Sequence, residues 1–199
     1  MRRVVVNEFM SLDGVVQAPG AEDEDASGGF AHGGWHLRYF EEVSQNWVLD
    51  GIVEAGAFLL GRRTWEIFEA YWPDAPEEEQ VIAVPLNTKP KYVASTTLTE
   101  PLAWQNSTLL QGDVAEAVAA LRREDGGDLH VIGSTVLVRT LIEHGLVDEL
   151  RLMIDPVVLG GGKRIFSQDG VLRQLRLVDG QVTSTGVFLA TYRSEGSEA

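Results

Sequence analysis

The chain contains no cysteine among its 199 residues. Disulfide bonds, thiolate catalysis and cysteine-ligated zinc sites are therefore excluded. It also lacks an apolar stretch of the roughly 18 residues that a membrane span requires. The first residues include Arg2 and Arg3 but no long apolar region, so they do not form a secretory signal. From these absences we expect a soluble cytoplasmic protein that has no membrane partner.

Basic residues are scarce, because 16 Lys and Arg stand against 30 Asp and Glu, and the formal net charge is −14. Nucleic acids are bound through a cationic surface that pairs with phosphates, so we expect no nucleic-acid partner. Histidine is also scarce, with four residues. His32 and His36 bracket a Gly-Gly-Trp segment, but so few ligands disfavour a metal site, and we expect none. Against this acidic background the pairs Arg62-Arg63 and Lys163-Arg164 stand out.

Short apolar runs alternate along the chain with stretches that have helical spacing. We predict one α/β domain over residues 1–193 and a frayed tail over residues 194–199. Repeated strand–helix–strand units followed by a terminal hairpin indicate three layers around a mostly parallel sheet with an antiparallel C-terminal edge. The predicted strands are 2–9, 57–60, 91–95, 107–110, 129–132, 149–154, 172–178 and 186–193; the main predicted helices are 36–55, 63–71, 113–123 and 135–144.

Residues 10–35 have little periodicity and carry an acidic cluster at 22–25. A loop this long in a compact domain is usually a lid, a binding loop or a disordered insertion. We expect it to cover a site and exclude water.

Two strand–turn–helix junctions carry most of the functional information. Residues 129–137 read as a buried strand that runs through Gly133-Ser134 into a helix. Residues 57–65 repeat the pattern, and there the helix opens with Arg62, Arg63 and Thr64. Such a junction directs free backbone N–H groups and the positive end of a helix dipole at one point, which suits a phosphate. Two of them in one small domain predict a dinucleotide site, provided that they lie side by side.

Taken in order, the motifs of the chain resemble the dihydrofolate reductase-like superfamily. Within it the chain is most similar to the reductase (RibD C-terminal) domain of bifunctional riboflavin-biosynthesis deaminase-reductases. The resemblance implies NADPH as the cofactor, a small-molecule substrate and a homodimer. The matching motifs are Ser11-Leu12-Asp13-Gly14, Gly61-Arg62-Arg63-Thr64-Trp65-Glu66, Lys91-Tyr92-Val93-Ala94-Ser95, Val131-Ile132-Gly133-Ser134, and Asp148-Glu149-Leu150 leading to Pro156-Val157-Val158-Leu159-Gly160-Gly161-Gly162.

The same resemblance implies the roles of individual residues. Most are cofactor-binding, because in hydride transfer the protein mainly fixes distance and excludes water. An arginine at a helix start suits the 2′-phosphate, and Ser95 and Thr96 at a neighbouring strand end suit it as well. Folate reductases typically carry a glycine triplet where this chain has Gly133-Ser134-Thr135, which removes backbone freedom and adds two hydroxyl donors. The full predicted cofactor set is Gly61, Arg62, Arg63, Thr64, Ser95, Thr96, Gly133, Ser134 and Thr135.

Two further segments are candidates for contact with the substrate. Asp13 follows the first strand, where a carboxylate suits catalysis or binding of a substrate hydroxyl or amine. An Asp-Gly turn explains it equally well. Gly161, Gly162 and Lys163 form a flexible cationic loop that suits a substrate phosphate, or merely a turn at the sheet edge.

We therefore expect an NADPH-dependent reductase of a small heterocyclic substrate, similar to the ribosylamino-uracil reductase of riboflavin biosynthesis. A dihydrofolate or pteridine reductase is the first alternative. It is weakened because Glu41 and Glu42 do not align with the pterin-anchoring carboxylate of folate reductases. A catalytically silent NADP-binding dimer is the second alternative.

Overall fold

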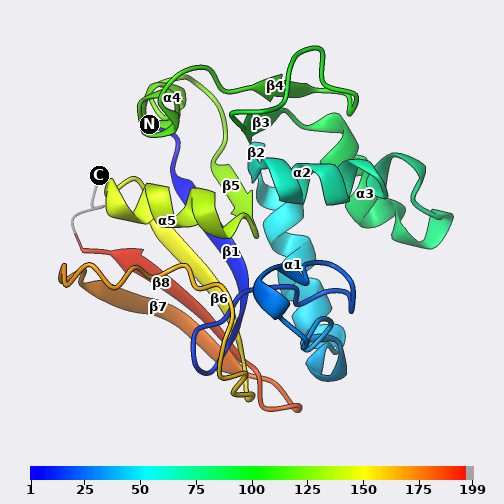
Figure 1. Ribbon diagram of the computed structural model, residues 1–199, viewed down its shortest axis with the longest axis vertical. Coiled ribbons are helices and arrows are strands. Elements are labelled where there is room, and N and C mark those ends of the chain that lie inside the picture. The colour runs from blue at the N-terminus through cyan, green and yellow to red at the C-terminus, as the bar shows by residue number, and fades with distance from the viewer. Residues whose placement is uncertain (196–199) are drawn as a thin grey trace.

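The computed structural model describes residues 1–195, which form an eight-stranded sheet with the strand order β4-β3-β2-β5-β1-β6-β8-β7 (Figure 1). The first six strands in this order are parallel, and β8 and β7 join antiparallel at one edge. This is the predicted mostly parallel sheet with its C-terminal edge hairpin. The strands are β1 (Val4–Ser11), β2 (Ala57–Gly61), β3 (Lys91–Ala94), β4 (Ser107–Leu109), β5 (Leu129–Ile132), β6 (Glu149–Asp155), β7 (Leu175–Val182) and β8 (Phe188–Ser194).

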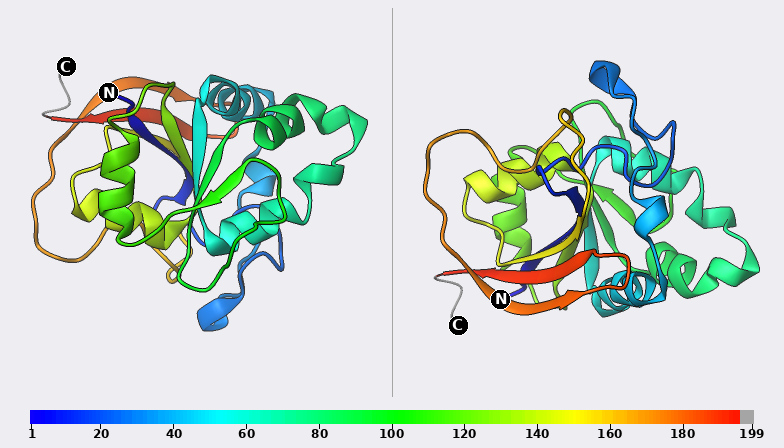
Figure 2. Two further views of the ribbon diagram at one scale, coloured as in Figure 1. Left: turned by 90° about the horizontal axis from the view of Figure 1, so that it is seen from above. Right: turned by 90° about the horizontal axis from the view of Figure 1, so that it is seen from below.

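Helices cover both faces of the sheet, and α1 and α5 lie on opposite sides of it (Figure 2). The side chains of β2 show why both faces are covered, since Ala57 and Leu59 pack with α4 and α5 while Phe58 and Leu60 pack with α1, α2 and α3. All four are completely buried. A strand that is apolar on both faces belongs in the centre of a three-layer domain. The helices are α1 (Glu42–Glu54), α2 (Arg62–Glu69), α3 (Gln80–Thr88), α4 (Val114–Leu121) and α5 (Thr135–Glu143).

The predicted helix over 36–55 begins later than its spacing indicates. Residues Leu37–Tyr39 form a single 3-10 turn, Phe40 is extended, and α1 starts at Glu42. The cause is tertiary, because the buried His36 bonds to Asp155 at the end of β6 and holds the preceding chain against the sheet.

The C-terminal tail is shorter than expected. Ser194, assigned to the tail, is the last residue of β8, and its hydroxyl donates to the carbonyl of Val147 at 2.8 Å. Residues 196–199 lie outside the described residues. Within the described part of the chain, no helix is long and apolar enough to cross a membrane.

Candidate functional site

The two predicted strand–helix corners meet at the carboxyl edge of the sheet. β2 and β5 are neighbouring parallel strands, so the turns that follow them emerge side by side. The N–H of Gly61 donates to Ser134 Oγ at 2.9 Å, and Ser134 Oγ lies 3.0 Å from Thr64 Oγ1. Figure 1 shows α2 and α5 starting at the same place. The proximity on which the dinucleotide prediction depends is confirmed.

Both helices begin without a side-chain cap. The N-cap residues, Gly61 for α2 and Ser134 for α5, make no capping hydrogen bond, whereas Asp113 caps α4 by accepting from the N–H of Glu116 at 3.0 Å. The first N–H groups of a helix have no partner inside the helix. The starts of α2 and α5 therefore present unsatisfied donors and two positive dipole ends side by side, which is an arrangement that suits an anion.

The turn before α5 has an unusual backbone. Gly133 and Ser134 have φ values of 55° and 64°, a left-handed conformation that is costly for serine. The Ser134 hydroxyl, expected as a donor to phosphate, bonds instead within the protein and joins the two corners. It is therefore a brace between the corners, and backbone N–H groups and Thr64 and Thr135 remain as donors for an anion.

Ser95 and Thr96 follow β3, which pairs with β2 so that Ala94 lies beside Gly61. The Ser95 oxygen accepts from the backbone N–H groups of Thr97 and Leu98 at 3.1 and 3.0 Å, and it therefore closes its own turn. The end of β3 beside the α2 corner is therefore polar, but the Ser95 hydroxyl oxygen already accepts two hydrogen bonds from its own turn.

Two of the predicted binding cations converge on one acidic residue that the sequence did not single out. Arg63 Nη1 and Lys163 Nζ each lie 2.6 Å from a different carboxylate oxygen of Asp25. Burial opposes ionisation of Asp25, but hydrogen bonds, first from Lys163 and then from Ser27, outweigh it and lower the pKa of this carboxyl to about 2. Asp25 thus connects residues 12–35 both to the α2 corner, through Arg63, and to the glycine-rich loop of residues 159–162, through the adjacent Lys163. Arg62, in contrast, is exposed and pairs with Glu66 in its own helix at 3.0 Å.

The carboxylate of Asp13 makes several hydrogen bonds within the protein. Its carboxylate accepts from Ser11 Oγ and from the backbone N–H groups of Leu159 and Gly160, at 2.7, 3.1 and 3.0 Å. Arg164 lies 3.3 Å from it. These hydrogen bonds together outweigh burial and lower the pKa of Asp13 to about 2. These contacts make Asp13 an anchor for the glycine-rich loop (residues 159–162), and its expected catalytic role stays a prediction.

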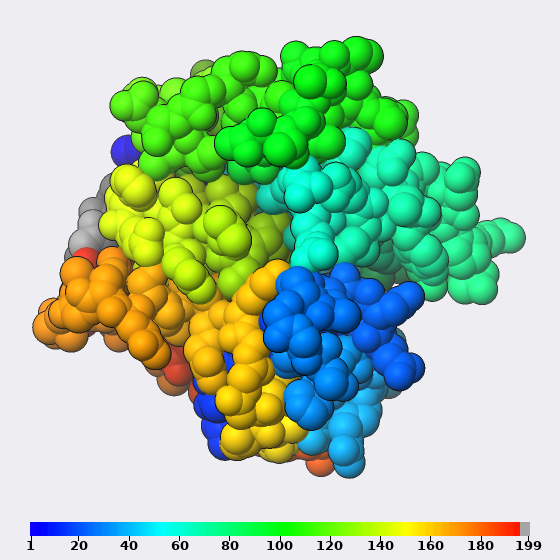
Figure 3. All heavy atoms as spheres, in the orientation of Figure 1, coloured from blue at the N-terminus to red at the C-terminus, as the bar shows by residue number. Residues whose placement is uncertain are grey.

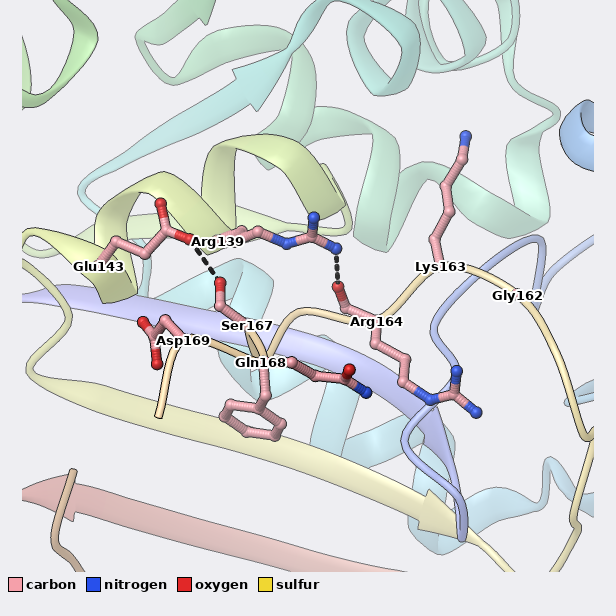
Figure 4. Close-up of a pocket in the computed structure, with 9 residues that line it drawn as sticks. Arg139, Glu143, Gly162, Lys163, Arg164, Ser167, Gln168 and Asp169 are labelled. Carbon is pink, nitrogen blue, oxygen red and sulfur yellow. Dashed lines mark hydrogen bonds between the residues drawn. The ribbon is translucent and has the colours of Figure 1, made fainter. Parts of the chain in front are cut away.

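The segments around the corners border one another on one face of the molecule, where the blue loop meets α2, α5 and the chain after β6 (Figure 3). A cavity of about 410 Å³ lies between residues 27–32 of the loop and residues 161–163. A second, of about 510 Å³, lies beside α5 (Figure 4). There Lys163 and Arg164 point in different directions, and the guanidinium of Arg139 donates to the carbonyl of Arg164 at 2.6 Å.

Three buried acidic or basic groups near this edge were not predicted as site residues. His36 Nδ1 lies 2.7 Å from Asp155 Oδ2, and the imidazole stacks on Phe9 with ring centroids 4.2 Å apart. Glu8 lies inside the apolar first strand. An acidic residue within an apolar strand was the sequence feature that could have identified Glu8 as a buried carboxyl. His36 and Asp155 are too far apart in sequence for their pairing to be predicted. Among residues 1–195, no cluster of three His, Asp or Glu side chains is arranged to hold a metal ion.

Comparison with known proteins places the chain in a family. The model of the family described as "RibD C-terminal domain" matches residues 2–189. The chain belongs to this family. Two relatives from Bacillus subtilis (strain 168) are similar to it over most of their length. "Uncharacterized protein YyaP" is 28% identical over 98% of this chain and 96% of its own, and "Uncharacterized protein YwjB" is 24% identical over 88% and 89%.

Solved structures share the architecture of this RibD C-terminal domain. A "Putative riboflavin biosynthesis protein" from Shewanella sp. PV-4 superposes with a TM-score of 0.70 at 20% identity, covering 98% of this chain and 99% of its own. A "pyrimidine reductase-like protein" from Corynebacterium diphtheriae has a TM-score of 0.67 at 12% identity, covering 98% and 92%. At such identities the likeness establishes the single-domain α/β fold with its antiparallel edge.

Proposed function

We propose that this RibD C-terminal domain protein is an NADPH-dependent reductase of a small heterocyclic substrate, similar to the ribosylamino-uracil reductase of riboflavin biosynthesis. The observation that carries the proposal is the meeting of two uncapped helix starts beside Ser134, because two neighbouring sets of free N–H groups suit a pyrophosphate. The family, and the name of one solved structure that shares the fold, a "pyrimidine reductase-like protein", support a reductase.

The predicted cofactor residues fit this coenzyme. Backbone N–H groups after Gly61 and Gly133, with Thr64 and Thr135, would bind its pyrophosphate, and Arg62 or Arg63 with Ser95 and Thr96 would bind the 2′-phosphate. When bound, NADPH supplies a hydride. Residues 12–35 act as a lid that excludes water, and Asp25 closes it by holding Arg63 and Lys163. Gly161, Gly162 and Lys163 contact the substrate, and Asp13 positions their loop.

The arginines provide a direct test of coenzyme choice. We expect Arg62→Ala or Arg63→Ala to weaken NADPH binding by roughly 1.5–3 kcal/mol, since a charge-assisted bond to the 2′-phosphate is lost. NADH, which lacks this phosphate, should bind nearly unchanged. Fluorescence titration of each variant with both coenzymes measures the difference.

A matched control is Arg123→Ala, because Arg123 is exposed beyond the end of α4 and away from both corners. It should bind both coenzymes like the unmodified protein. Equal weakening of NADPH and NADH in the Arg62 and Arg63 variants would remove the 2′-phosphate role.

The contacts of Glu41 favour this substrate class over pterins. Its carboxylate bonds to the hydroxyl and N–H of Ser184 in the turn between β7 and β8. In this proposal Glu41, at the N-cap of α1, is occupied by Ser184 and anchors no pterin. We expect no tight antifolate binding.

We also propose that the protein is a homodimer joined through β7. This strand ends the sheet, and Leu175, Leu177 and Val182 on it are 37%, 47% and 67% exposed. An exposed apolar edge strand is a ready template for pairing. Leu177→Arg should convert a dimer to a monomer in sedimentation experiments, whereas a monomeric unmodified protein would contradict the proposal.

A further inference from the structure

Glu8 is a buried carboxyl group without a partner. It lies inside the apolar strand β1, is only 5% exposed, and its Oε1 atom has no hydrogen-bond partner. Burial first, and then the nearby Glu24 carboxyl, raise the pKa of Glu8 well above its usual range. Within residues 1–195 no cation pairs with it. An unsatisfied buried group of this kind costs stability, so its presence requires an explanation.

The register of β1 places Glu8 at the α5 corner. Side chains alternate along a strand, and Glu8 shares a face with Val6 and Met10, which pack in the cluster formed with α4 and α5. Asn7 occupies the other face, next to α1. The last pair between β1 and β5 is Asn7 with Ile132, so the next residue on each strand is Glu8 on β1 and Gly133 on β5. Glu8 therefore lies on the first strand beside Gly133, the glycine of the α5 corner.

The strand order fixes the sequence in which the strand ends follow one another along the carboxyl edge of the sheet. Starting from β3, this order is β3, β2, β5 and β1. A coenzyme with its 2′-phosphate near Ser95 and Thr96 and its pyrophosphate at the two corners must extend its nicotinamide end toward β1. On this face of β1 the polar side chain nearest the α5 corner is that of Glu8.

We propose that the buried, unpartnered carboxyl of Glu8 binds the carboxamide of the nicotinamide ring, an inference that rests on the proposed function. A neutral carboxyl presents one donor and one acceptor, and a primary carboxamide presents the complementary pair. Glu24, the neighbouring charge, has the same sign and favours the neutral form. The group that destabilises the free protein is thus satisfied when the coenzyme is bound, as is common at functional sites.

Two variants of the full-length protein separate binding from a structural role. Glu8→Met removes the hydrogen-bonding group and keeps an apolar chain of similar length. Glu8→Gln keeps one donor and one acceptor site. Each is titrated with NADPH and with adenosine 2′,5′-bisphosphate, which carries the adenosine phosphates but no nicotinamide, and thermal unfolding of the free protein is recorded.

We expect Glu8→Met to bind NADPH about 5–10-fold more weakly. Adenosine 2′,5′-bisphosphate should bind unchanged, and Glu8→Gln should bind both ligands like the unmodified protein. The free Glu8→Met protein should unfold about 2–4 °C higher, because an unpaired buried polar group is removed. A residue with a purely structural role would lower the unfolding temperature instead.

These measurements distinguish failure of the proposed function from failure of the role of Glu8. If the unmodified protein binds neither ligand, the proposed function is overturned and this inference with it. If it binds both, and Glu8→Met binds NADPH equally well, the role of Glu8 alone is overturned.

Discussion

Replacing Asp148 with alanine is expected to lower the free energy of unfolding by about 3–5 kcal/mol, because it leaves a largely buried arginine without its counter-ion. Both carboxylate oxygens of Asp148 accept from Arg122 Nη2, at 2.7 and 2.9 Å, and one also accepts from the buried N–H of Val4 at 2.8 Å. The Asp148 and Arg122 side chains are only 12% and 17% exposed. One residue thus joins β1, the end of α4 and the start of β6. Denaturant unfolding followed by circular dichroism measures the loss.

Asp148→Asn is the matched control, since an amide oxygen still accepts from Val4 while the charge and one acceptor oxygen are lost. Its cost should be smaller, roughly 1–3 kcal/mol. Asp148 precedes β6 at the edge of the sheet opposite the two corners. The folded variants should therefore bind NADPH normally. A loss below about 1 kcal/mol in the alanine variant would show that Arg122 finds another partner.

The sequence was sufficient to predict the fold of this molecule and the meeting of its two strand–helix corners. Apolar runs that end in glycine, such as those of β2 and β5, indicate buried parallel strands followed by helices. The order of such units restricts where their ends emerge. The motif Asp148-Glu149-Leu150 was recognised, but only the structure shows that Asp148 is a clasp at the opposite edge and not part of the site.

Contacts made by the long loop could not be predicted. Asp25 reaches Arg63 and Lys163 across 38 and 138 residues of sequence, and nothing in an aperiodic acidic segment identifies which carboxylate will do so. Two cations assigned to ligands therefore proved to share an internal counter-ion. Glu8 was missed because a strand buried on both faces has no alternation of polar and apolar residues to reveal where a side chain points.

Within the glycine-rich loop, we expect two adjacent glycines to respond very differently to alanine. Gly162→Ala should cost roughly 2–4 kcal/mol of unfolding free energy, since its φ of 130° suits only glycine and an added Cβ would lie 2.5 Å from the buried Val15. The strain would move the loop away from residues 12–35. It would also separate Lys163 from Asp25, the contact that closes the lid.

Gly161→Ala is the control, because its φ is not left-handed and a Cβ there meets no atom within 4 Å. It should change stability by less than about 0.5 kcal/mol. Thermal unfolding separates the two variants, and limited proteolysis within residues 12–35 reports whether the lid is released: faster cleavage is expected only for Gly162→Ala. If both variants are equally stable and equally resistant, the loop adapts around residue 162, and the packing of Gly162 against Val15 does not hold the lid.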